Sequence, residues 1–133
     1  MNPFIRNRKD AEFSAKFPLP AAGATSVSPA FDLEQMHGGE LEHVAAVCEI
    51  PALAALRADG LTVTVQDSDD GVTFADCRPV TLVTVEGSPQ GSAADATPFR
   101  FHPTTRRYVR VEVAVATGAG NVTAAQAEFN LLF

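Results

Sequence analysis

The stretch DSDDGVTF, residues 67–74, places three carboxylates within four positions and follows them with a glycine. An EF-hand calcium loop needs oxygen ligands at alternate positions and a bidentate glutamate at its twelfth position. Counted from Asp67, Gly71 occupies the fifth position, where a ligand is required, and Arg78 occupies the twelfth. The spacing therefore does not match an EF-hand. Adventitious calcium binding by the four nearby carboxylates remains an alternative: Asp67, Asp69, Asp70 and Asp76.

A β-hairpin explains the same stretch without a metal. Asp69 and Asp70 suit a type I turn, because their side chains bond to nearby backbone N–H groups, and Gly71 suits the left-handed position that follows. We therefore expect the strand over 61–67 to pair with a strand that begins at Val72.

Other residues that could do chemistry lack the spacing that chemistry requires. HGGELEH (37–43) has two histidines but no HExxH or HxH pattern, no serine lies in GxSxG, and GSPQGS (87–92) lacks the spacing and lysine of a phosphate loop. Cys48 and Cys77 are not in a CxxC pair, so we expect free core thiols in a reducing compartment, with a single disulfide as the alternative. The sequence predicts no catalytic residue, no metal and no cofactor, and hence a protein that is not an enzyme.

Charge is distributed unevenly along the chain. The formal net charge is −6, residues 31–76 carry ten acidic residues against Arg57 alone, and residues 1–20 are basic. An acidic body argues against nucleic-acid binding through phosphates, whereas a basic N-terminus suits docking onto a partner or a neighbouring subunit. Arg106, Arg107 and Arg110 in TTRRYVR are expected to form salt bridges with nearby acids or with a partner chain.

The elements that must position these residues are short strands. LTVTVQD (61–67) and RYVRVEVAV (107–115) alternate apolar and polar residues with the period of two that indicates half-buried strands. PALAALRADG (51–60) is expected to be a connection between Pro51 and Gly60. Further strands are predicted over 42–50, 80–85, 98–102 and 122–133. Such strands in a chain of 133 residues predict one all-β domain, a jelly roll or β-sandwich.

The N-terminal residues do not fit this pattern. Pro18, Pro20 and Pro29 keep the backbone extended and remove ladder donors, so we expect an extended N-terminal arm over 1–24 ahead of a jelly-roll β domain over 25–133. One edge strand is expected near 25–33. A disordered terminus is the alternative to an arm that becomes ordered on a partner. The arm contains no apolar signal region, and no apolar run approaches the roughly 20 residues of a membrane span, so we expect a soluble intracellular protein.

Two resemblances begin at the hairpin. LTVTVQDSDDGVTF followed by RRYVRVEV is similar to discoidin-like jelly rolls, which implies a carbohydrate-binding module. A longer ordered set also resembles the capsid cement, or decoration, proteins of tailed bacteriophages: KFPLPAAGATSVSPAFDL, EIPALAALRADGLTVTVQDSDDGVTF and RRYVRVEVAVATGAGNVTAAQAEFNLLF. This second resemblance covers about residues 16–133.

The decoration-protein resemblance implies a structural protein of a phage or prophage virion, a small jelly roll on the capsid exterior that joins major capsid subunits. It implies a homo-oligomer, a dimer or trimer, made in the host cytoplasm, with no nucleic-acid or membrane partner. We expect the arm to supply the capsid or inter-subunit contact, with packing against the domain's own barrel as the alternative for its phenylalanines. The predicted contact residues are Phe4, Arg6, Arg8, Lys9, Phe13 and Phe17.

Overall fold

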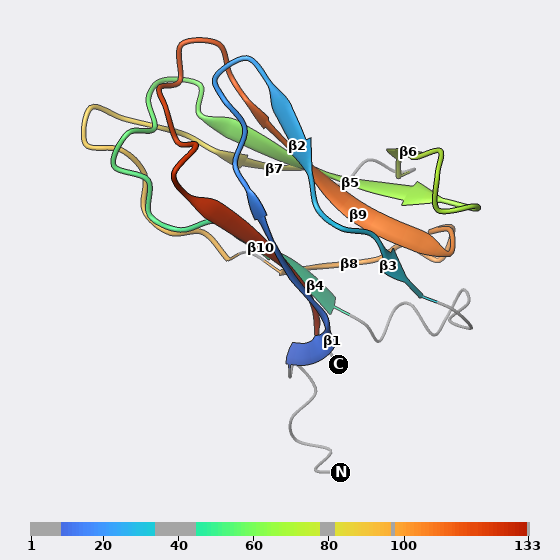
Figure 1. Ribbon diagram of the computed structural model, residues 1–133. Helices are drawn as coiled ribbons and strands as arrows, with labels where there is room; N and C mark the ends of the chain where they lie inside the picture. The colour runs from blue at the N-terminus through green and yellow to red at the C-terminus, as the bar shows by residue number, and fades with distance from the viewer. Residues whose placement is uncertain (1–8, 34–44, 78–81, 97, 133) are drawn as a thin grey trace.

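The computed structural model describes residues 9–33, 45–77, 82–96 and 98–132, which form two antiparallel sheets packed face to face (Figure 1). In sheet A the strand order is β1 (Lys9–Pro18), β10 (Gln126–Leu132), β4 (Ala45–Glu49) and β8 (Pro98–Arg100). In sheet B the order is β2 (Thr25–Val27), β9 (Tyr108–Val115), β5 (Leu61–Ser68) and β6 (Ala75–Asp76). Two more strands join sheet B, because β3 (Phe31–Asp32) also pairs with β9 and β7 (Leu82–Val85) with β5. The predicted all-β sandwich is confirmed, and the jelly-roll form of it stays a prediction.

The core lies between the sheets and follows the alternation of the sequence. The four valines of β9 are buried, while the residues between them are only partly buried. Phe31 of sheet B stacks on Phe129 of sheet A with ring centroids 5.1 Å apart, so the aromatic pair links the two layers. Each such ring removes on the order of 150–250 Å² from water, which makes this contact a major part of the core.

The N-terminal residues differ from the extended arm expected over 1–24. Residues 9–18 form β1, which pairs with β10 from Ser14↔Asn130 to Pro18↔Gln126. Phe17 and Leu19 are each 3% exposed and belong to the core. The prolines allow this pairing because β1 is an edge strand, so one side of its backbone needs no partner. The part of the predicted arm that the structure describes is therefore integrated into the domain.

The remaining strand predictions agree with the structure in their positions. The expected edge strand near 25–33 is confirmed as β2 and β3, and residues 51–60 connect strands without forming a helix. The hairpin prediction is right about Gly71, which has φ +76°, but wrong about a strand starting at Val72. Pairing resumes only at Ala75, opposite Asp67, because the intervening backbone bonds to side chains instead.

Both cysteines are free and buried, as predicted. Burial raises the pKa of Cys48 to about 12 and that of Cys77 to about 12. The described ranges contain no helix, and so none that is long and apolar enough to cross a membrane.

Candidate functional site

One end of sheet B is held by charged side chains, and we call it the charged end: Asp32, residues 66–76 and residues 102–110. Asp67 continues the inward phase of Leu61, Val63 and Val65, so its carboxylate is buried at the end of the core, 4% exposed. It accepts hydrogen bonds from the backbone N–H of Arg106 at 2.9 Å and from Nε and Nη2 of the same guanidinium at 3.1 and 2.9 Å. These hydrogen bonds raise the pKa of Arg106 above its ordinary value. The pair joins the end of β5 to the segment before β9.

The other two arginines of the charged end are also held in place. Arg107 donates from Nε and Nη2 to the two oxygens of Asp32, both at 2.8 Å, in a bidentate pair. Arg110 donates from Nε to Gln66 at 2.9 Å, and its guanidinium lies 4.1 Å from the centroid of the Phe74 ring. The predicted salt bridges are confirmed for Arg106 and Arg107, whereas Arg110 pairs with an amide and an aromatic ring.

The loop between β5 and β6 is ordered by two of its own side chains. Oγ of Ser68 accepts the backbone N–H groups of Asp70 and Gly71, at 3.2 and 3.0 Å. Oδ1 of Asp70 accepts the N–H groups of Val72 and Thr73, both at 2.9 Å. Hydrogen bonds to the ionised form stabilise it, so the pKa of Asp70 falls to about 2. Asp67 and Asp70 thus act as structural acceptors.

The opposite end of β5 and β9 is closed by backbone contacts among three loops, and we call it the glycine end: residues 53–60, 85–92 and 115–120. Backbone hydrogen bonds run from Arg57 N–H to Ala119 C=O at 2.8 Å and from Gly87 N–H to Ala58 C=O at 3.1 Å. A Cβ added at Gly60 would lie 1.9 Å from the carbonyl oxygen of Val85, and Gly60 has φ +67°. The loops can therefore meet only because a glycine stands at the contact.

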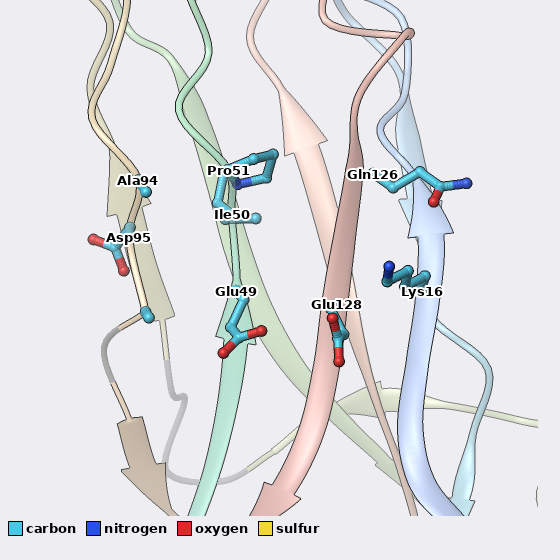
Figure 2. Close-up of a pocket in the computed structure, with 9 residues that line it drawn as sticks. Lys16, Glu49, Ile50, Pro51, Ala94, Asp95, Gln126 and Glu128 are labelled. Carbon is cyan, nitrogen blue, oxygen red and sulfur yellow. The ribbon is translucent and has the colours of Figure 1, made fainter. Parts of the chain in front are cut away.

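An open groove of about 420 Å³ lies on the outer face of sheet A (Figure 2). Lys16, Glu128 and Glu49 form one row across it, because Glu128 is the register partner of both other residues. Asp95 and Gln126 line the groove with Pro51 and Ile50. Figure 2 shows the polar side chains spread along the groove rather than converging on one point. The groove offers hydrogen-bonding groups to a polar ligand, but it has no aromatic ring in its lining.

The structure describes only three of the six predicted contact residues: Lys9, Phe13 and Phe17. Phe4, Arg6 and Arg8 lie outside the described residues, as does HGGELEH. Lys9 and Phe13 belong to β1, where Lys9 is the register partner of Leu132, and Phe17 is packed in the core. For Phe17, the structure agrees with the alternative of packing against the domain itself.

No three His, Cys, Asp or Glu side chains in the described ranges are placed to hold a metal ion together. Of the candidate calcium ligands, Asp67 is engaged by Arg106 and Asp70 by its own loop. His102 contacts Thr104 through Nδ1 at 2.8 Å.

The long-range partners at the charged end were not identified from the sequence. Asp32 and Arg107 are 75 residues apart, and Asp67 and Arg106 are 39 apart. Asp67 is in phase with the buried residues Leu61, Val63 and Val65 of the same strand. A carboxylate at an inward position needs a cationic partner, and this was the one feature of the sequence that could have indicated the pair.

No protein-family model matches this chain, and no curated protein matches it. The resemblance to capsid decoration proteins therefore depends on the sequence motifs alone.

Proposed function

We propose that this chain is a capsid decoration protein of a phage or prophage, which stabilises the head by binding major capsid subunits on the exterior. Three features support the proposal: the ordered set of motifs, the two-sheet sandwich, and the position of β1 at the edge of sheet A, directly after a basic N-terminal stretch. The position of β1 at the edge of sheet A is the main support for the proposal. An edge strand has unpaired backbone groups on one side, so β1 and the basic residues that precede it in the sequence can contribute to binding a neighbouring subunit.

Charge supports a role for this segment in binding. Residues 1–9 contain Arg6, Arg8 and Lys9 and no acid, whereas the remaining residues carry a formal charge of −9 within the total of −6. A cationic segment on an acidic body is attracted to acidic patches of a partner or of a second copy, and the attraction weakens as salt screens it. A dimer or trimer arranged around this segment, with a jelly-roll body, belongs to the same proposal.

The decisive experiment is capsid binding by the full chain and by a chain lacking residues 1–8. A larger deletion, of residues 1–20, would remove β1 together with Phe17 and Leu19, and would unfold the domain that it is meant to test. Capsids assembled from the major capsid protein of the same genome are mixed with each chain and sedimented. We expect the full chain to co-sediment in proportion to capsid subunits and the shortened chain to bind at least tenfold more weakly.

Two variants separate charge from length in this experiment. Arg6→Gln with Arg8→Gln removes two charges, whereas Arg6→Lys with Arg8→Lys keeps them. Light scattering of the same chains reports whether a dimer or trimer needs residues 1–8. A full chain that does not bind capsids would contradict the proposed function.

The groove on sheet A favours a second candidate, a carbohydrate-binding module. Its carboxylates accept hydrogen bonds from sugar hydroxyls, and Lys16 and Gln126 donate. A sugar that binds there raises the melting temperature through ligand linkage, and Gln126→Ala abolishes the shift. A glycan screen with no such shift would eliminate this candidate.

A further inference from the structure

Val72 stands out at the tip of the β5–β6 loop. It is 81% exposed, and among the described residues the next most exposed large apolar side chain is that of Val27, at 41%. Single exposed apolar residues are common and need no explanation by themselves. This one differs because the bonds of Ser68 and Asp70 to four successive backbone N–H groups fix the loop that presents it. Figure 1 shows this loop projecting beyond the end of sheet B.

Two cation–π pairs lie next to the loop: Arg107 with Tyr108, and Arg110 with Phe74. A Cβ added at Gly71 would lie 3.4 Å from the Tyr108 ring, so the loop backbone rests on that ring. The guanidinium of Arg107 is 5.2 Å from the centroid of the Tyr108 ring, beside the Phe74–Arg110 pair. Tyrosine and arginine are enriched at the energetic centres of protein interfaces.

These side chains are already fixed in the free protein. Arg107 is held by Asp32 and Arg110 by Gln66. Ordering long side chains is a main entropic cost of association, roughly 0.5–1.5 kcal/mol for each one. Binding a partner at this surface would therefore not have to order the side chains of Arg107 and Arg110.

The charges around Val72 select the kind of partner. The Asp69 side chain is 78% exposed, and Asp70, with its pKa of about 2, is ionised at neutral pH. An anionic lipid surface would repel these carboxylates, and one valine buries too little apolar area to hold a membrane. A protein surface with basic side chains around an apolar pocket fits both features.

We infer that the tip of the β5–β6 loop is a second capsid contact, in which Val72 enters an apolar pocket of a capsid subunit and Asp69 and Asp70 face lysine or arginine at its rim. This inference rests on the proposed function. It adds a rigid contact at the charged end to the basic segment that precedes β1.

The test compares Val72→Ser with Val27→Ser in the full chain. Both side chains are exposed, so neither substitution disturbs the core, and equal melting temperatures confirm that both variants fold. Binding to assembled capsids is measured by co-sedimentation. We expect Val72→Ser to weaken binding at least tenfold and Val27→Ser to leave it unchanged. Raising NaCl from about 50 to about 500 mM should also weaken binding of the wild-type chain.

Each other outcome has a distinct meaning. If Val72→Ser binds like the wild type, or Val27→Ser is weakened equally, the loop contact is excluded while the decoration function stands. If the wild-type chain does not bind capsids, both proposals fail together. Binding to phosphatidylserine vesicles that depends on Val72 would also overturn the inference, because it would identify the occupant as lipid.

Discussion

The two ends of the β5–β9 pair are closed by different physical means. At the glycine end, three loops meet backbone to backbone, and Gly60 and Gly91 leave the space that side chains would fill. At the charged end, side chains connect the loops, through Asp67 with Arg106 and Asp32 with Arg107. The first end depends on close backbone packing, which its glycines permit. The second end depends on charge and presents ordered polar groups to solvent.

This difference indicates which end is suited to recognition. Backbone packed against backbone leaves few groups for a partner, whereas a network of carboxylates and guanidinium groups around aromatic rings offers directional contacts. If the two ends differ in energetics as they do in construction, substitutions at each end should change stability by different amounts and for different reasons.

The largest effect is expected for Gly60→Ala at the glycine end. The added methyl would lie 1.9 Å from the Val85 oxygen, and φ of +67° strains any residue with a Cβ. Overpacking and backbone strain together should lower the free energy of unfolding by about 4 kcal/mol. Gly118→Ala is the matched control, since Gly118 has φ +83° but nothing within 4 Å of its added Cβ. It should cost about 1 kcal/mol by strain alone. Similar denaturant midpoints for the two variants would show that the contact can relax.

A smaller loss is expected for Asp67→Asn at the charged end. The amide keeps the shape but removes the charge and places N–H donors against the donors of Arg106. Breaking a buried pair costs about 3–5 kcal/mol, and since the Arg106 side chain is 36% exposed we expect about 2–3 kcal/mol. The neighbouring Asp69→Asn is the control, because the Asp69 side chain is 78% exposed and its contact with Arg106 is 3.4 Å long. Equal unfolding free energies for the two variants would contradict a structural role for Asp67.

The sequence predicted the strands that run between the two ends, but it did not predict the contacts that close either end. Alternation in 61–67 and 107–115 identified β5 and β9, because the period of two depends only on local pattern and burial. The partners of the arginines stayed unidentified, since nothing local links Asp32 to Arg107 across 75 residues. The expected arm shows the same limit. The prolines predicted an extended arm over 1–24, but an edge strand tolerates proline, and residues 9–18 pair with β10 instead.

The two buried thiols can report whether the charged end opens separately. Burial raises the pKa of each thiol to about 12, so a thiol reagent at about pH 8 reacts only after an opening exposes the thiol with an ordinary pKa. Cys77 follows β6 at the charged end, and Cys48 lies in β4 of sheet A. Asp67 contributes to the raised pKa of Cys77 and Arg106 opposes it, so the pair is broken from the arginine side. We expect Arg106→Gln to accelerate labelling of Cys77 at least fivefold more than that of Cys48, measured by peptide mass spectrometry. Equal acceleration of both thiols would mean that the sandwich opens only as a whole.

The smallest effect is expected from the pH dependence of the β5–β6 loop. The pKa of Asp70 falls from 3.8 to about 2 because its carboxylate accepts the N–H groups of Thr73 and Val72 and the hydroxyl of Ser68. Between these values the unfolded chain binds the proton more readily than the folded one, so the contribution of Asp70 to stability is complete above about pH 4 and disappears as the pH falls towards 2. Asp70→Asn removes this titration, and the melting temperatures of wild type and variant should therefore converge from pH 5 to pH 2. Curves that stay parallel over this range would show that the loop bonds contribute no pH-dependent stability, and that charge holds this end only through Asp67 and Asp32.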